Sequence, residues 1–242
     1  MSLLTIAQGV ARPAPVLVPT AVFGSNDSNA LLLRSCLSRA GKSLHRMHDW
    51  TVLVKEYTFT TTASTANYVL PTDFARFCGD TVWDRANYER MRGPLSAQEW
   101  QSYKSSILGT SISRFRRHRV RLNTLALGTE FYLDPTPTAS AETLAFEYVS
   151  TFWCKTSADA GLADWAADTD VGVIDEHLIE LAATWRFFDR LGMAYGEAKA
   201  ECDEETDKAW ARDSGMMALS LVPSAGIRFI GPENVPDTGM GS

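Results

Sequence analysis

The sequence lacks the features that mark membrane and secreted proteins. Nowhere in its 242 residues does a run of apolar residues approach the ~20 that a membrane span requires. The N-terminal segment Met1–Val10 has neither a basic region nor a long apolar core, so we expect no signal peptide. These absences favour a cytoplasmic product, or one carried in a particle that is assembled there.

Motifs of catalysis and of metal binding are also missing. None of the sequences G-x-S-x-G, Walker A, G-x-G-x-x-G or H-E-x-x-H occurs. The 4 cysteines are scattered without a C-x-x-C pair, which predicts free and mostly buried thiols, and the 4 histidines show no metal-ligand spacing. We therefore predict no catalytic, cofactor-binding or metal-binding residue and no cofactor. An acid pair of the glycosidase kind stays open, because such pairs form in space and leave no sequence motif.

Charge is divided unevenly along the chain. Residues 1–121 carry 16 Lys and Arg against 8 Asp and Glu, a balance of +8, whereas residues 122–242 carry 7 against 21, a balance of −14. Such a division suits a protein whose basic front meets the acidic back of another copy, because complementary potentials steer and align an interface. It is equally compatible with two halves that pack within one molecule and neutralise each other.

Helices are predicted in the N-terminal part. A short helix over 3–11 is followed by a proline-rich connector and by a longer helix over about 28–48, which Asp27 can cap. Apolar residues of the longer helix recur every three or four positions and so share one face, namely Leu33, Leu37, Ala40, Leu44 and Met47. The opposite face is basic and carries Arg34, Arg39, Lys42 and Arg46.

The C-terminal part is predicted to be helical from Val173 to about residue 213. The first helix ends near Gly192, which permits a turn, and the second helix is strongly acidic. Apolar residues of the first helix recur at helical spacing, namely Ile174, Leu178, Leu181, Trp185, Phe188 and Leu191. Residues 219–242 contain prolines and glycines but few periodic apolar positions, so we expect an extended tail that is unpacked in the isolated monomer.

The middle of the chain is predicted to be rich in β-strands. Alternating β-branched and aromatic residues indicate a strand over 52–60, and residues 66–70 are the expected partner strand. Ser96 and Glu99 form a capping box that begins a short helix to about Ile107. Longer strands are expected over 112–122, 127–133 and 142–152, with short strands near 81–83 and 88–92.

A cluster of arginines lies in one of these strands. On a strand, Arg117, Arg119 and Arg121 would share one face, with His118, Val120 and Leu122 on the other. Three interpretations stay open: an edge strand kept soluble by charge, a contact with the acidic helix of a neighbouring subunit, or a contact with DNA phosphates. The overall acidity argues against a general DNA-binding protein. The candidate contact residues are Arg114, Arg116, Arg117, Arg119 and Arg121 in the strand, and Glu204, Glu205 and Asp207 in the acidic helix.

Several short signatures follow one another in a fixed order. They are His48-Asp49-Trp50, the segment from Tyr68 to Phe74, the segment from Thr81 to Arg85, the segment from Gly93 to Trp100, the segment from Leu144 to Ser150, Trp185-Arg186, Gly192-x-x-Tyr195 and Arg212-Asp213. By their order and spacing, from about Ser2 to Leu221, the chain resembles the head-to-tail adaptor (tail accessory, tail tubular protein A-like) family of short-tailed bacteriophages.

The resemblance implies an α+β fold. This fold consists of a helical bundle, a small central β-rich domain and an extended C-terminal tail. The N-terminal helical part (1–49) and a C-terminal helical hairpin (173–218) would form the bundle, and the β-rich domain (50–155) would contain one short helix. Residues 156–172 would be a loop and residues 219–242 the tail. The helix–strand–helix order expected from the residues themselves agrees with this arrangement.

The resemblance also implies partners and a place in the virion. Twelve copies would form a ring between the portal protein and the tail nozzle protein, extending the channel for packaged DNA and retaining that DNA. The ring would also offer a platform to tail fibres, and it would be assembled in the host cytoplasm without any membrane contact. The tail would anchor each copy on the portal, with Ile227, Phe229 and Ile230 as apolar anchors.

The leading hypothesis is therefore a structural protein of the virion and not an enzyme. The first alternative is a hydrolase that cleaves cell-wall glycan during entry with carboxylates that no motif identifies; clearing on a peptidoglycan zymogram would reveal it. The second alternative is a DNA-binding accessory factor, which predicts that the free monomer shifts duplex DNA with a steep dependence on salt.

Overall fold

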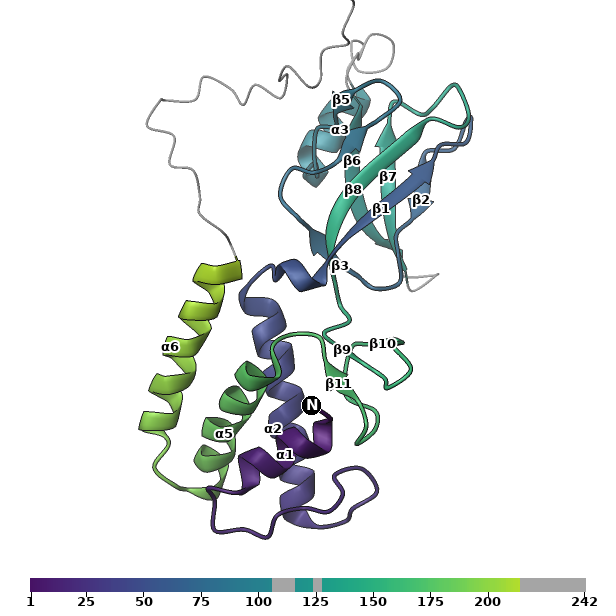
Figure 1. Cartoon of the computed structure of the whole chain (residues 1–242). Helices are drawn as coiled ribbons and strands as arrows, with labels where there is room; N and C mark the ends of the chain where they lie inside the picture. The colour runs from purple at the N-terminus through teal and green to yellow at the C-terminus, as the bar shows by residue number, and fades with distance from the viewer. Residues whose placement is uncertain (106–115, 124–127, 214–242) are drawn as a thin grey trace, which may run out of the picture.

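The computed structural model of the chain describes residues 1–105, 116–123 and 128–213. Its elongated shape has a helical part at one end and a β-rich part at the other (Figure 1). The chain crosses between the two parts after helix α2 and again after strand β8 (Figure 1). Helices and antiparallel sheets are thus combined in one chain, which confirms the predicted α+β class.

The helical part begins with α1 (Leu3–Ala11) and α2 (Ser28–Met47), each of which starts at a capping side chain. The Ser2 hydroxyl accepts a hydrogen bond from the Thr5 amide, and the Asp27 carboxylate accepts one from the Ala30 amide. In α2 the expected apolar stripe is buried except for Met47, whose exposed fraction is 62%. The prediction was wrong at Met47 because α2 ends there and the chain turns toward the β-rich part.

The hairpin predicted at the C-terminal end consists of α5 (Glu176–Leu191) and α6 (Gly196–Asp213). Asp175 caps the start of α5, and Gly192 ends it in the left-handed conformation with φ of 71°. Helix α5 contacts α1, α2 and α6, and it therefore has two apolar sides. None of the helices in the described part of the chain is long and apolar enough to cross a membrane.

The predicted apolar face of α5 is not the side of the helix that is buried most deeply. Leu178 is buried as expected, but Leu181, Trp185 and Phe188 are only half-buried. Trp185 contacts Tyr195 and Lys199 on the side of α6. The deeply buried side of α5 consists of Leu178, Ile179, Ala182, Ala183 and Phe187.

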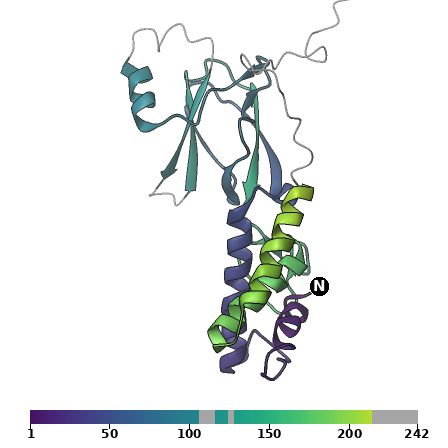
Figure 2. The ribbon, with the colours of Figure 1, turned by 90° about the vertical axis from the view of Figure 1, so that its left-hand side faces the viewer.

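The β-rich part contains two antiparallel sheets. One sheet has five strands, namely β1 (Val54–Thr60), β3 (Phe74–Phe77), β4 (Trp83–Asp84), β5 (Glu89–Arg90) and β8 (Thr143–Ser150). The other has three, in the order β2 (Asn67–Val69), β7 (Gly128–Asp134) and β6 (Arg117–Asn123). Figure 2 shows the sheets as two layers, with α3 (Ala97–Ser105) outside the three-stranded one. Between the layers, the rings of Phe131 and Phe146 stack with their centroids 6.0 Å apart.

The partner of the first strand differs from the prediction. Strand β1 pairs along its whole length with β8, from Val54 opposite Val149 to Thr60 opposite Thr143, whereas β2 pairs with β7 in the other sheet. The chain crosses from one sheet to the other between β1 and β2, so that Phe59 of β1 meets Tyr68 of β2 across the core with 4.9 Å between ring centroids. Burying aromatic rings between two layers stabilises this arrangement.

The segment 156–172, expected as a loop, contains two short strands. Strands β10 (Gly161–Leu162) and β11 (Val171–Gly172) pair with either side of β9 (Cys154–Lys155). The Asp168 carboxylate accepts hydrogen bonds from the amides of Val22 and Phe23, at 3.1 and 2.9 Å for its Oδ1 atom. The segment therefore holds the proline-rich connector between α1 and α2 against the helical part.

Candidate interaction surfaces

At the junction between the helical and β-rich parts, the segment that follows α2 is held by hydrogen bonds to Asp213, the last residue of α6. Its carboxylate accepts from the Thr51 amide at 2.9 Å and from His48 Nε2 at 3.1 Å. Burial would raise the pKa of Asp213, but the hydrogen bonds from Thr51 and His48 outweigh burial and lower that pKa. Two signatures that lie far apart in the sequence, His48-Asp49-Trp50 and Arg212-Asp213, thus meet at this junction.

Arg76 of strand β3 strengthens the same junction from the β-rich side. Its Nε atom donates to the Asp49 carboxylate at 2.6 Å, and its Nη2 atom donates to the carbonyls of His45 and His48 at 3.1 and 3.0 Å. Carbonyls at the C-terminal end of a helix lack partners within that helix and attract cations. Arg76 therefore joins the end of α2 to the five-stranded sheet.

Asp73 is the centre of a second polar cluster near the junction. Its carboxylate, buried in the protein, accepts hydrogen bonds from Lys55 Nζ at 2.8 Å, Tyr148 OH at 2.9 Å and Ser150 Oγ at 2.7 Å. Burial alone would raise the pKa of Asp73, but these hydrogen bonds lower it below its usual value. The signature from Tyr68 to Phe74, which contains Asp73, and the signature from Leu144 to Ser150 therefore take part in the same structural contact.

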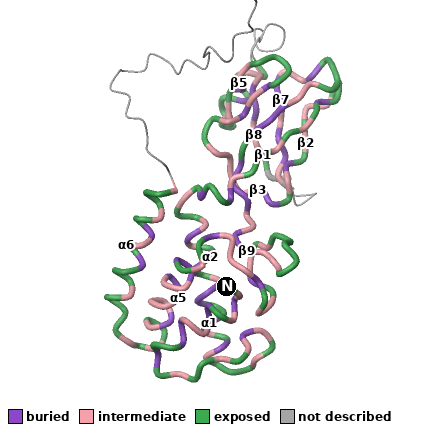
Figure 3. Tube along the Cα trace, viewed as in Figure 1, coloured by how far each residue is buried: buried purple, intermediate pink, exposed green. Residues whose placement is uncertain are grey.

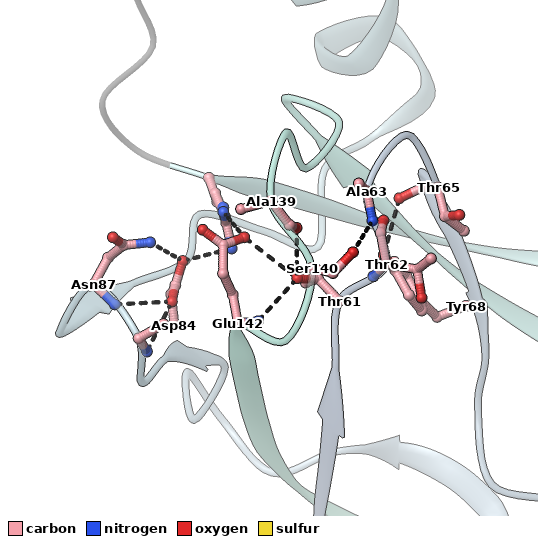
Figure 4. Close-up of polar contacts among 12 residues, drawn as sticks. Thr61, Thr62, Ala63, Thr65, Tyr68, Asp84, Asn87, Ala139, Ser140 and Glu142 are labelled. Atoms are coloured by element: carbon pink, nitrogen blue, oxygen red, sulfur yellow. Dashed lines mark hydrogen bonds and ion pairs between the residues drawn. The ribbon is translucent and has the colours of Figure 1, made fainter.

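The arginine cluster is placed partly inside the β-rich part. Arg116 has a side chain only 13% exposed and pairs with the carboxylates of Asp84, at 2.8 Å, and Glu142. Figure 4 shows the contacts around these two carboxylates: Asp84 accepts from Asn87, and Glu142 accepts from Thr61. Arg116 thus neutralises two acids of the same molecule.

The strand that carries the other arginines is β6, as predicted, with Arg117, Arg119 and Arg121 along one side. Arg117 is buried and pairs with Asp134 at 3.1 Å, and its guanidinium lies 4.0 Å from the centre of the Tyr103 ring of α3. Arg119 is half-buried and Arg121 is exposed. Strand β6 lies at the edge of its sheet, but Arg116 and Arg117 are held in internal ion pairs and do not act as the exposed charges of the first interpretation. The contact with a subunit or with DNA stays a proposal for Arg119 and Arg121.

His118, on the other side of β6, lies in the aromatic core. It is 1% exposed, its ring stacks on Phe131 with 5.1 Å between centroids, and neither ring nitrogen has a hydrogen-bond partner in the described part of the chain. Burial lowers the pKa of His118 to about 4, against the smaller opposing effect of Asp80. The folded protein therefore keeps His118 neutral, which predicts a dependence of stability on pH.

The stability of the protein is expected to fall as the pH is lowered from the ordinary pKa of histidine, 6.5, toward 4. In this range the unfolded chain takes up a proton at His118 and the folded chain does not, so acid favours unfolding, by about 3 kcal/mol in total. Denaturant unfolding at a series of pH values measures this loss. The variant His118→Phe keeps an aromatic ring without a titrating group; an unchanged slope above pH 5 in this variant would refute the assignment.

The acidic helix α6 is attached to the rest of the molecule by one narrow side. Cys202 and Thr206 are its buried residues, and Figure 3 shows exposed residues along its outer side. Lys208 pairs with Glu204 at 2.7 Å and with Glu205 at 2.8 Å, whereas Asp207 is exposed. The three acids predicted to contact another subunit therefore lie on or beside an open face, with one cation shared by two of them.

The division of charge between the two halves of the sequence is partly compensated inside the molecule. Ion pairs join cations of the first half to acids of the second, as in Lys42–Asp164, Lys104–Asp134, Arg116–Glu142 and Arg117–Asp134. The intramolecular interpretation therefore applies to these ion pairs, while α6 keeps exposed acids whose contact with another copy stays a prediction.

The remaining predicted residues include two groups that cannot be compared with the structure. Arg114 and the tail residues Ile227, Phe229 and Ile230 lie outside the described residues. The four cysteines are free thiols as predicted, and burial raises the pKa of Cys154 to about 12. Within the described ranges, no cluster of three or more His, Cys, Asp or Glu could hold a metal ion.

Comparison with protein families gives one match that covers most of the chain. The sequence model of a family described as SU10 adaptor protein matches residues 1–219, which include every residue that the structure describes. No protein with curated information matches the chain.

Proposed function

Because the chain belongs to the SU10 adaptor protein family, we propose that it is the head-to-tail adaptor of a short-tailed bacteriophage. The family makes it a phage adaptor, a structural component of the virion that contacts other head and tail proteins. In our proposal, twelve copies form a ring between the portal and the tail nozzle. The ring extends the DNA channel, retains the packaged DNA and offers a platform to tail fibres. It would be assembled in the host cytoplasm.

The observation that carries this proposal is the extent of the family match. A match over residues 1–219 includes the helical part, the β-rich part and the junction between them, so it is not the property of one common motif. The signatures at the junction agree with a structural function, because their polar side chains are engaged in holding the two parts together.

Opposite charges on different helices support the assembly of a closed ring. In a head-to-tail ring, one surface of each copy meets a different surface of the next, so the two surfaces can have opposite charge. The exposed acids of α6 and the exposed arginines of α2 provide such a pair of surfaces. The contact of Arg119 and Arg121 with a subunit or with the DNA in the channel also belongs to this proposal.

We propose that residues after α6 attach each copy to the portal. Helix α6 ends at Asp213, at the junction, and the following segment carries Ile227, Phe229 and Ile230. Replacing these three residues by alanine together is expected to abolish stable binding to the portal of the same phage, because the apolar anchors would be lost. Co-sedimentation of the variant with purified portal measures this binding.

A matched control is the double variant Val235→Ala with Met240→Ala, which removes apolar side chains elsewhere in the same segment. This control should bind like the natural protein. Equal binding of the triple variant and the natural protein would refute the role of the three anchors.

The family match speaks for a structural function and gives no support to the hydrolase alternative. We therefore do not propose an enzymatic activity.

A further inference from the structure

Helix α2 presents an unusual outer side, with a groove along each of its flanks. One groove, of about 360 Å³, lies between α2 and α5, and the other, of about 230 Å³, lies between α2 and the segment of Asp164 and Trp165. Ser35 lines both grooves. Because its side chain is small, the ridge of α2 that separates the two grooves is narrow at this position. A ridge flanked by two grooves has the shape that receives a helix in ridges-into-grooves packing.

The groove between α2 and α5 is positively charged. Arg39 of α2 and Arg186 and Arg190 of α5 line it, together with one acid, Asp189. Neither Arg39 nor Arg190 forms an ion pair with another residue in the described part of the chain. Burial is the main cause that lowers the pKa of Arg186, and nearby Arg39 adds to it. The groove therefore holds more positive charge than it can neutralise by itself.

The basic character continues along the exposed side of α2. Leu31, which is 50% exposed, begins this side near the start of the helix, and Arg39, Lys42 and Arg46 follow toward its C-terminal end. Lys42 pairs with Asp164, so Arg39 and Arg46 remain open to an anionic partner. Along the exposed side of α2, from the start of the helix to its end, an apolar residue therefore comes first and the cations follow.

The outermost stripe of α6 is complementary in charge and regular in spacing. Opposite the buried Cys202 and Thr206, exposed residues recur at steps of three and four and are therefore in line along the helix. At roughly 1.5 Å per residue the stripe is about 21 Å long. It consists of Glu197, Ala200, Glu204, Asp207 and Ala211.

We propose that the outer side of α2, with its two grooves, receives the outer stripe of α6 from a second copy of this chain. Ala200 and Ala211 let the two helices approach closely, and Glu204 and Asp207 would meet the guanidinium groups of Arg39 and Arg190. The inference rests on the proposed function, because the ring supplies the second copy. The proposed contact would join the helical part of each copy to the helical part of the next copy in the ring.

Charge-reversal variants test the contact between α2 and α6. The measured quantity is the assembly of rings on the portal. The groove variant, Arg39→Glu with Arg190→Glu, and the stripe variant, Glu204→Arg with Asp207→Arg, are each expected to reduce ring formation about tenfold or more, because like charges then face each other. An equal mixture of the two variants should restore rings, since each reversed surface then finds an opposite one. A single chain with all four changes should also assemble.

Controls separate this inference from loss of folding and from failure of the proposed function. Arg12→Glu with Glu147→Arg reverses exposed charges elsewhere and should assemble like the natural protein. If the natural protein forms no ring on the portal, the proposed function fails. If it does and either variant assembles equally well, or if neither the mixture nor the combined variant restores rings, the contact between α2 and α6 is refuted. Loss of DNA binding without loss of assembly would instead assign the groove to nucleic acid.

Discussion

Asp73→Ala is expected to lower the free energy of unfolding by about 3 kcal/mol near neutral pH. The carboxylate accepts from Tyr148 and Ser150, whose hydroxyls are buried and would lose their acceptor. Lys55 contributes less, because its side chain is 49% exposed and water can replace the lost partner. Urea denaturation of the two proteins gives the difference.

Glu204→Ala is the matched control for Asp73→Ala. Glu204 also pairs with a lysine, Lys208, but its side chain is 70% exposed and it lies inside a helix, so its removal should leave stability unchanged. The pKa of Asp73 is lowered in the folded protein, so its contribution is present above the unfolded pKa and disappears as acid protonates the folded carboxylate. Equal stability of Asp73→Ala and the natural protein would show that the cluster around Asp73 does not hold the sheet.

Gly41→Ala is expected to destabilise the protein by about 2 kcal/mol, although the same change usually stabilises a helix. A Cβ atom at Gly41, inside α2, would lie 2.0 Å from the Trp153 ring, which must therefore move. Trp153 has little freedom to do so: it is 1% exposed, donates a hydrogen bond to the Ala163 carbonyl at 2.7 Å and packs against Trp165. Thermal and denaturant unfolding measure the loss.

Gly196→Ala provides the comparison, because Gly196 also lies in a helix but its added Cβ would have no atom within 4 Å apart from its chain neighbours and the nearby backbone of its own helix. This variant should be as stable as the natural protein or slightly more stable. If Gly41→Ala behaves in the same way, Trp153 is not packed as tightly against α2 as the structure indicates.

The helices could be predicted closely because their ends carry local signals. Asp27 and Gly192 act at the helix ends where the sequence places them, and the capping box of Ser96 and Glu99 forms both of its hydrogen bonds, at 3.2 and 2.9 Å. Each of these contacts joins residues close in the chain, so spacing alone reveals them. Packing between helices is less predictable, as the half-buried face of α5 shows.

The strand partners and the ion pairs were not predictable in the same way. The pairing of β1 with β8 joins residues from Val54 to Val149, and no local pattern distinguishes it from a hairpin with β2. Likewise, the sequence shows the arginine cluster but not the carboxylates of Asp84 and Glu142 that neutralise Arg116. The number of charged residues in the sequence therefore overestimates the charge that the folded protein exposes on its surface.

The candidate surfaces were predicted in part. The acids of α6 lie on an exposed helix, as the sequence indicates, but the grooves beside α2 depend on how α5 and the segment before it pack, which spacing does not reveal. The order of signatures indicated the family without showing what the signatures do. In the structure, His48 and Asp213, 165 positions apart, meet at the junction.

The most direct test of the adaptor function is the mass of the purified protein, alone and after mixing with the portal of the same phage. Light scattering and negative-stain images would give both the mass and the shape of the complex. We predict a monomer that becomes a ring stacked on the portal, with twelve copies per portal. A protein that stays monomeric and unbound in the presence of the portal would contradict the account.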